Sequence, residues 1–276
     1  MTGFRAGYSK YNWLNQPGVV VEADTEALNA PASNVVTYEV GVPWTAINLS
    51  LSGGSATLTA LLGATRPIEC LGFVIPERVD DASDVDFAPT IKANDGVRWR
   101  LSSVDDPMTI GDVFDSDLDL PSPLDAAFEP EFGVHGFILP DGPLNAARLD
   151  LTITLASVPA PPFDLFHVGR VWAGPFTRFI VNWTKGTREW AWVEDDLEHQ
   201  VRRWTAEFGT VRDSEVPGLQ RLSQQLGTRR QVFWWPKESD PSQAFIGRFR
   251  DAGSFRHKYN DAQLWTPSVQ EDWLGV

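Results

Sequence analysis

The chain is poor in the residues on which many small metal and redox sites depend. It has a single cysteine, Cys70, and four histidines among 276 residues. One cysteine excludes a disulfide within the chain and any metal site with several cysteine ligands. Cys70 lies in the apolar segment IECLGFVI, where a buried, unreactive thiol is favoured over a reactive one.

Long hydrophobic segments are also missing. No apolar run reaches the roughly 18 residues that predict a membrane-spanning helix. The first residues, MTGFRAGYSKYNW, lack the apolar stretch of a secretion signal. We therefore expect no membrane insertion and no cleaved signal peptide.

Positive charge is scarce and unevenly placed. The net charge is −14. Residues 1–158 hold 8 Lys/Arg against 22 Asp/Glu, whereas residues 159–276 hold 15 of each. An acidic surface repels nucleic acid and anionic lipid, so we expect no nucleic-acid partner. The neutral second half places Arg among Trp, a composition typical of contact surfaces between proteins.

Common catalytic motifs are absent as well. The sequence contains no G-x-S-x-G elbow, no phosphate-binding loop, no G-x-G-x-x-G and no H-E-x-x-H. Adjacent acids such as Glu194–Asp196 are better explained as surface charge than as a glycosidase pair, which needs two carboxylates across a cleft. The sequence therefore predicts a protein that is not an enzyme.

Short apolar–polar alternations fill the region from Asn34 to Ser157. They include NVVTYEV, TAINLSLS (with Ile47, Leu49 and Leu51 on one face), ATLTALLG, IECLGFVIP, VRWRLSS, VHGFILP and ARLDLTITLA. A period of two, bounded by turn residues at short spacings, is typical of a β-sandwich or jelly roll. We predict such a domain over residues 34–158.

The proline-rich segment SVPAPPF, residues 157–163, predicts a semi-rigid linker. We place a domain boundary near residue 160, with a second domain over residues 159–276. Residues 1–33 have no persistent period and form an N-terminal arm. This arm is either a mobile terminus or a segment that orders against a neighbouring subunit, because its aromatic side chains are costly to leave in water.

Nine of the twelve tryptophans lie after residue 163, in short strand-like segments. One helix is expected within EVPGLQRLSQQLGTRR, where leucines recur at helical spacing, Pro217 fits the first turn and Gly227 fits the end. The fold class is therefore mainly β: a jelly roll followed by a Trp-rich β, or α+β, domain with one short helix.

Several segments resemble tailed-phage virion proteins that carry a discoidin-like, or galactose-binding-like, jelly roll. LGATRPI at residues 62–68, the segments at residues 98–107 and 114–120, and VGRVWAGPF at residues 168–176 match that pattern in order and spacing. RQVFWWPKESDP, residues 230–241, is similar to a later strand and turn of the family.

The resemblance implies a minor component of a phage tail tip or baseplate. Such a protein would be made in the host cytoplasm and built into the virion. It would assemble as a homo-oligomeric ring or trimer with other tail proteins, joining the tail tube or hub to peripheral parts. The alternative is a carbohydrate-binding adhesin that holds a host-surface glycan in its jelly-roll loops.

The adhesin hypothesis places its ligand in the loops around Trp44, Asp81, Asp105 and Asp106. No cofactor is expected other than a calcium ion, for which the acidic run DVFDSDLDL offers Asp115, Asp117 and Asp119 as ligands. Alternating acids on a strand also share one face, so a solvated acidic face is the favoured interpretation.

The tryptophans are expected to pack in a core or a subunit interface rather than to stack on sugars. Trp190 and Trp192 share one strand face, whereas Trp234 and Trp235 occupy opposite faces, so one of this second pair must look towards a partner or another layer. The predicted interface residues are Trp172, Trp183, Trp190, Trp192, Trp204, Trp234, Trp235 and Trp265.

Overall fold

The computed structural model of the chain contains two compact units with different sequence composition. Residues 11–175 form one, called here the jelly-roll unit, and residues 1–10 with 176–273 form the other, called here the carrier unit. The structure describes the following residues: 6–36, 43–74, 96–103, 112–118, 135–138, 142–158, 160–161, 164–179, 185–193, 196–237, 243–251, 253–259 and 262–271.

The jelly-roll unit is an insertion within the sheet of the carrier unit. The chain leaves the carrier unit after β1 (Gly7–Ser9) and returns to it at β12 (Thr177–Arg178). These two strands are antiparallel neighbours, with Gly7 opposite Arg178 and Tyr8 opposite Thr177. Both chain crossings into the jelly-roll unit therefore start from adjacent strands of a single sheet.

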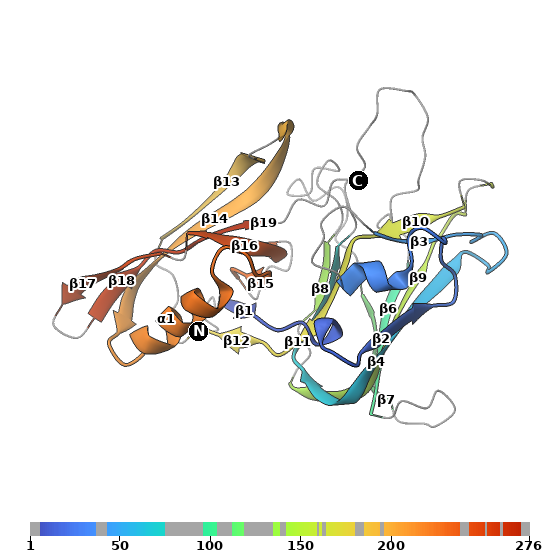
Figure 1. Cartoon of the computed structure of the whole chain (residues 1–276), viewed down its shortest axis with the longest axis horizontal. Coiled ribbons are helices and arrows are strands. Elements are labelled where there is room, and N and C mark those ends of the chain that lie inside the picture. The colour runs from blue at the N-terminus through green and yellow to red at the C-terminus, as the bar shows by residue number, and fades with distance from the viewer. Residues whose placement is uncertain are drawn as a thin grey trace. The chain divides into compact units, whose positions relative to one another are not determined.

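The jelly-roll unit is a β-sandwich (Figure 1). One sheet has five strands in the order β2-β4-β9-β6-β7, opposed by a three-stranded sheet, β11-β5-β8, and a two-stranded sheet, β10-β3. Its strands are β2 (Val20–Ala23), β3 (Trp44–Ala46), β4 (Ser55–Ile68), β5 (Cys70–Val74), β6 (Gly96–Ser102), β7 (Asp112–Leu118), β8 (His135–Ile138), β9 (Leu144–Thr154), β10 (Phe166–Val168) and β11 (Arg170–Gly174); the 3-10 helices are η1 (Trp13–Asn15) and η2 (Ala32–Val36).

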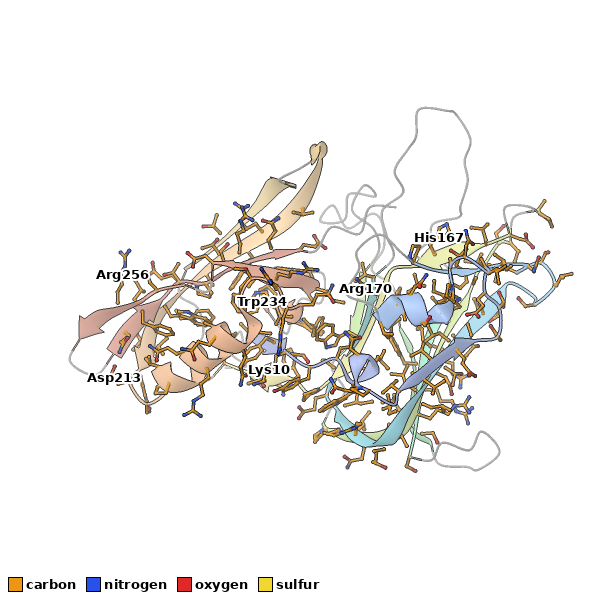
Figure 2. The ribbon with its side chains drawn as sticks, in the orientation of Figure 1. Lys10, His167, Arg170, Asp213, Trp234 and Arg256 are labelled. Atoms are coloured by element: carbon orange, nitrogen blue, oxygen red, sulfur yellow. The ribbon has the colours of Figure 1, made fainter. Side chains whose placement is uncertain are left out.

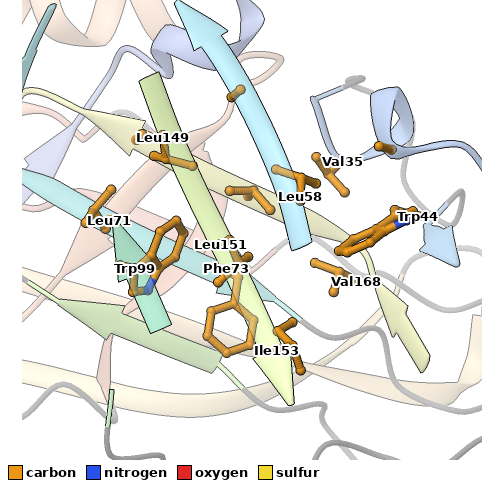
Figure 3. Close-up of a cluster of buried hydrophobic side chains, with 14 of the residues drawn as sticks. Val35, Trp44, Leu58, Leu71, Phe73, Trp99, Leu149, Leu151, Ile153 and Val168 are labelled. Carbon is orange, nitrogen blue, oxygen red and sulfur yellow. The ribbon is translucent and has the colours of Figure 1, made fainter. Parts of the chain in front are cut away.

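Alternation along β4 and continuous burial along β5 and β11 build the core of the sandwich. On β4 the even-numbered residues from Ala56 to Leu62 are buried, while their odd-numbered neighbours are partly exposed. The buried side chains of β6 and β9 face those of β3, β5, β10 and β11, and Figure 3 shows Trp44, Phe73 and Trp99 within this layer. Burying each large side chain contributes about 1.5–3 kcal/mol, so the core alone can account for the fold of this unit.

A bulge bends the longest strand of this sheet. The register of β4 against β9 shifts between Leu61 and Arg66. Gly63 lies in this interval with φ of +66°, and a Cβ there would meet the carbonyl oxygen of Gly18 at 3.1 Å. Positive φ and close backbone approach both favour glycine. The bend lets one strand continue from Ser55 to Ile68 across the sandwich.

The carrier unit is built on a nine-stranded antiparallel sheet. The strand order is β12-β1-β15-β16-β19-β14-β18-β17, and β13 also pairs with β14. Its remaining elements are β13 (Lys185–Val193), β14 (Asp196–Arg212), α1 (Val216–Leu226), β15 (Val232–Trp235), β16 (Phe245–Asp251), β17 (Phe255–Tyr259), β18 (Ala262–Trp265) and β19 (Ser268–Glu271).

Two long ribbons dominate this sheet. The hairpin of β13 and β14 pairs Lys185 with Glu207 at one end and Val193 with Asp196 at the other. The second ribbon runs along β16 and β17 and returns along β18 and β19; its register shifts between Phe249 and Asp251 and again between His257 and Tyr259. Figure 1 shows β13–β14 and β17–β18 extending beyond the strands next to α1. Their extended parts present strand faces that the helix does not cover.

The helix α1 follows the expected sequence signals. Pro217 lies in its first turn, and Gly227 ends it with φ of +52°. Val216, Leu222 and Leu226 are buried against the sheet, in a cluster with Tyr8, Trp234 and other aromatic residues. The predicted single short helix is therefore confirmed among the residues that the structure describes, and the chain is mainly β as expected. None of the described helices is long and apolar enough to span a membrane.

The domain boundaries differ from those predicted at residues 33 and 158. Strands β10 and β11, expected in the second domain, pair with β3 and β5 of the jelly-roll unit. Residues 11–33, expected as an arm, contribute η1 and β2 to the same unit. Composition changes near residue 160, but strand pairing carries the jelly roll on to residue 175.

The segment TAINLSLS, residues 45–52, is not the strand that its apolar–polar alternation predicts. Only Trp44–Ala46 is a strand, and residues 49–54 form a turn. Asn48, Gly53 and Gly54 all have positive φ, which breaks an extended strand. Leu51, expected on an apolar face, is 86% exposed.

Candidate functional site

Five of the eight tryptophans predicted at an interface are buried inside the chain itself. Their exposed fractions are all 4% or less, for Trp172, Trp204, Trp234, Trp235 and Trp265. Their side chains are therefore buried from solvent by the chain itself, without a second subunit. Trp183 lies outside the described residues, and for Trp190 and Trp192 the structure gives only their backbone pairing, opposite Arg202 and Gln200. An interface role for these three stays a prediction.

Trp234 and Trp235 show why the expected outward-facing tryptophan does not occur. They occupy opposite faces of β15, as predicted, but both faces are covered by the chain. Trp234, which is labelled in Figure 2, packs against Trp204 and Phe179, with ring centroids 5.5 Å apart in each pair. Trp235 lies against Phe233 and Phe176, and its Nε1 donates a hydrogen bond to the carbonyl oxygen of Lys237 at 2.8 Å.

Of the four jelly-roll positions predicted to hold a ligand, the structure contradicts one and does not describe the other three. Trp44 is fully buried, packs edge-on against Phe166 and donates its Nε1 hydrogen bond to the carbonyl oxygen of Thr25 at 3.1 Å. It is a core residue and cannot stack on a sugar. Asp81, Asp105 and Asp106 lie outside the described residues.

The acidic run predicted as a calcium site forms a strand. In β7, Asp115 and Asp117 lie opposite Arg100 and Arg98 of β6 in antiparallel register. Asp119 lies outside the described residues, and within the described part no group of three or more His, Cys, Asp or Glu could hold a metal ion. A calcium site stays a prediction.

The outer face of the five-stranded sheet is polar and internally hydrogen-bonded. Asp150 of β9 is 8% exposed and accepts hydrogen bonds from Arg148, with two at 3.0 Å and one at 2.9 Å, and from the Thr59 hydroxyl at 2.7 Å. Thr57 and Thr152 link their hydroxyls at 3.0 Å in the next row. These five described side chains are already hydrogen-bonded to one another.

Two polar pairs join β10 and the segment before it to β3 and to the turn that follows β3. Asp164 accepts hydrogen bonds from Ser50, at 2.5 Å from the hydroxyl and 3.2 Å from the backbone N–H, and the Ser50 hydroxyl lowers the pKa of the Asp164 carboxyl. His167 shares a 2.8 Å hydrogen bond with the Thr45 hydroxyl, and burial lowers the pKa of its imidazole. Both pairs join neighbouring segments, a structural role that the sequence pattern gave no reason to expect.

The carrier unit has a groove between the start of α1 and the edge of its sheet. Its volume is about 310 Å³. Apolar walls are provided by Phe179, Phe208, Val211 and Leu219; polar groups at the rim belong to Tyr8, Thr177, Arg178, Ser214 and Glu215. Burial raises the pKa of the Tyr8 phenol, against the opposing effect of a hydrogen bond with Thr177. The hydroxyl therefore stays protonated well above neutral pH.

The groove can recognise an apolar side chain flanked by polar groups, but it holds no paired nucleophile and base. No local sequence pattern marks this groove, because its walls come from residues near 8, 178, 208 and 219, which only strand pairing brings together. The one available signal was Tyr8, an aromatic residue in an otherwise polar N-terminal segment. Cys70, by contrast, is buried as predicted, with its Sγ 3.5 Å from the carbonyl oxygen of Gly174.

Comparison with known proteins gives a limited result. No family model matches the chain, and no curated protein matches its sequence. Among solved structures, a family 32 carbohydrate-binding module of Clostridium perfringens NanJ in complex with galactose has 12% identity and a TM-score of 0.40, covering 62% of this chain and 99% of that chain. A fucose-binding module of Streptococcus pneumoniae has 12% identity and a TM-score of 0.39, covering 60% and 98%.

A chitosan-binding module from a Paenibacillus sp. IK-5 chitosanase/glucanase has 8% identity and a TM-score of 0.38, covering 60% of this chain and 99% of that chain. These three solved structures are each described as a carbohydrate- or sugar-binding module. Identities and TM-scores at this level are too low to transfer a ligand or a binding residue to this chain.

Proposed function

We propose that this chain is a non-catalytic binding protein that presents a glycan-binding jelly roll on a second, aromatic-cored β unit. The observation that carries the proposal is the insertion of residues 11–175 between β1 and β12, two adjacent strands of the carrier sheet. Both ends of the jelly roll are thereby attached to one sheet. This is the arrangement expected when a recognition domain is added to a scaffold at a loop between strands.

The carrier unit supports a scaffold role through its own core. Its sheet takes strands from both sides of the insertion, and four of its tryptophans, Trp204, Trp234, Trp235 and Trp265, are buried rather than left for a ligand. A sheet that assembles from both sides of an inserted domain can hold that domain without depending on it for a core. The division of labour proposed here is therefore recognition by the jelly-roll unit and attachment by the carrier unit.

Within the jelly-roll unit, the proposed ligand positions are the segments that contain Asp81, Asp105 and Asp106. Trp44 belongs to the core, and on the outer face of the five-stranded sheet Thr59, Arg148 and Asp150 are hydrogen-bonded to one another. Connecting segments at the ends of a sandwich are the usual place for recognition residues. Galactose, fucose and chitosan, named in the similar structures, are the sugars to test first.

We further propose the tail tip or baseplate of a tailed phage as the setting. The support for this is the sequence pattern at residues 62–68, 98–107, 114–120, 168–176 and 230–241. In that setting the carrier unit would join other tail proteins in a ring or trimer, and the jelly roll would contact host-surface glycan. Mass spectrometry of purified virions that encode this chain should detect it in stoichiometric amounts, and its absence from the particles would reject the setting.

The glycan proposal is tested with the intact chain on a glycan array at neutral pH, in the presence of calcium and in the presence of a chelator. We expect selective binding to a small group of sugars. The variant Asp105→Ala/Asp106→Ala should weaken that binding at least tenfold. The matched control Glu22→Ala/Asp24→Ala, which removes two exposed acids of the same unit, should stay within twofold of the unaltered chain. Binding to no glycan above background would reject the proposal.

A further inference from the structure

The charge of the molecule divides more sharply by unit than by sequence half. Residues 11–175 contain 7 Lys/Arg and 23 Asp/Glu, a balance of −16. Residues 1–10 with 176–276 contain 16 Lys/Arg and 14 Asp/Glu, a balance of +2. Within the second set, residues 216–230 contain three arginines and no acid. Helix α1 and the turn after it therefore form the most consistently basic part of an acidic protein.

These basic residues lie on α1 or next to it. Arg221 and Gln225 are one helical turn apart, and the Lys10 Nζ donates a hydrogen bond to the Gln225 Oε1 at 2.8 Å. The backbone N–H of Arg230 donates to the carbonyl oxygen of Leu226 at 3.2 Å, which keeps the following turn against the helix end. Figure 2 shows Lys10 beside α1. Lys10, Arg221, Arg229 and Arg230 are called the cationic patch.

The arginines of the patch have no counter-charge in the described part of the chain. Arg221, Arg229 and Arg230 are exposed, and their guanidinium groups make no hydrogen bond or ion pair with the described residues. Arg148 and Arg203, by contrast, are hydrogen-bonded to the side chains of Asp150 and Gln270. Positive charge near a helix C-terminus is favourable, which accounts for Arg229 and Arg230. It does not account for Arg221, which lies in the middle of α1.

We infer that the cationic patch docks against the acidic jelly-roll unit of a second copy of this chain. The two partners are complementary in charge: four cations on or next to α1 meet a unit whose balance is −16, and every copy carries both partners. A contact between two different surfaces of identical chains is heterologous, so it builds rings or open arrays rather than closed pairs. This inference does not depend on glycan binding.

Such a contact is weak and sensitive to salt. Exposed opposite charges attract across high-dielectric solvent, and screening shortens their range to about 8 Å at physiological ionic strength. Complementary charge mainly steers association and fixes orientation. Self-association through the patch should therefore be strong at low salt and largely lost at high salt.

The experiment is sedimentation velocity of the intact chain at pH 7.5 over a range of concentrations, in 50 mM and 500 mM NaCl. We expect reversible self-association that weakens at least tenfold at the higher salt. The variant Arg221→Gln/Arg229→Gln/Arg230→Gln should weaken association at 50 mM NaCl at least tenfold. The control Arg212→Gln/Arg250→Gln/Arg256→Gln changes net charge equally, on β14, β16 and β17, and should stay within threefold of the unaltered chain.

Three further measurements keep the result interpretable. Circular dichroism melting should show that the patch variant remains folded, since its three positions are exposed. Polyglutamate should dissociate the oligomers of the unaltered chain, which tests the patch even if the variant misfolds. A DNA oligonucleotide should not bind. The inference is overturned if the chain stays monomeric at 50 mM NaCl, if patch and control variants weaken equally, or if the patch binds DNA.

Discussion

At the scale of single residues, buried polar side chains decide how distant segments join. Asn12 is 6% exposed, yet all of its side-chain capacity is used: its Nδ2 donates to the carbonyl oxygen of Val171 at 2.8 Å, and its Oδ1 accepts from the backbone N–H groups of Leu14 and Ala173 at 3.2 and 3.1 Å. One amide thus holds the start of the jelly-roll unit against β11. The neighbouring Trp13 reinforces this by donating to the carbonyl oxygen of Pro67 at 2.7 Å.

Replacing Asn12 with alanine should therefore destabilise the jelly-roll unit by about 2–3 kcal/mol, because it leaves buried backbone groups of β11 and η1 without partners. Chemical denaturation followed by fluorescence would measure this loss. Asn15→Ala is the matched control, since Asn15 only accepts a long hydrogen bond of 3.4 Å from Asn12. Equal stability of the Asn12 and Asn15 variants would show that the amide does not anchor the segment.

His167 gives a prediction on pH. Burial lowers the pKa of its imidazole below the usual 6.5, so the folded chain binds a proton less readily than the unfolded chain. The stability that neutral His167 contributes is fully present above the pKa of this imidazole in the unfolded chain. As pH falls below about 6.5, stability is lost with a slope of at most about 1.4 kcal/mol per pH unit.

Melting temperatures measured between pH 8 and pH 5 would test this behaviour. His167→Gln should reduce the acid-induced loss, whereas the control His257→Gln should keep it. A pH dependence that the His167 variant leaves unchanged would assign the effect to other groups.

At the scale of elements, the ribbon of β16–β19 has a glycine kink where β16 passes into β17. Gly253 has φ of +77°, and a Cβ there would lie 2.6 Å from the carbonyl oxygen of Thr266 and 2.9 Å from the nitrogen of Pro267. The register changes on both strands at this point, from β16–β19 to β17–β18. Glycine at residue 253 is therefore required both by its backbone conformation and by the approach of the opposite strand.

Gly253→Ala should cost the carrier unit at least about 2 kcal/mol, from left-handed strain and backbone collision together. Thermal unfolding monitored by tryptophan fluorescence would report it, because the carrier core is rich in tryptophan. Gly142→Ala is the control, since a Cβ at residue 142 meets nothing within 4 Å. A Gly253 variant as stable as the control would mean that the ribbon does not need this kink.

Elements with strong local signals could be predicted from the sequence, and those fixed by distant partners could not. The helix at Val216–Leu226 and the strands around Ala56, Trp99 and Leu149 followed from periodicity. The turn after Asn48 looked like a strand because three positive φ angles leave no mark on hydrophobic alternation. Strand β1 has only three residues, and its place depends on Thr177 and Trp234, which are far away in sequence.

At the scale of the whole molecule, one unit interrupts the other. A change in charge marked a boundary near residue 160, but it could not show that residues 7–9 return to the sheet of residues 176–271. The tryptophans were expected to seek a second subunit, and at five of eight positions they fill the core of their own chain. The candidate site was for the same reason only partly predictable: three of the four proposed ligand positions lie outside the described residues, and the groove at Tyr8 needs strand pairing to exist.

The proposed display of the jelly-roll unit by the carrier unit depends most on this insertion. Hydrogen exchange of the intact chain, measured by mass spectrometry, tests whether the insertion exists. Residues 7–10 should be protected as strongly as β15 of the carrier unit, and residues 12–23 as strongly as β4 of the jelly-roll unit. The two groups should lose protection separately as denaturant is raised. If residues 7–23 instead exchange completely within seconds as a single mobile arm, the insertion and the display function built on it are wrong.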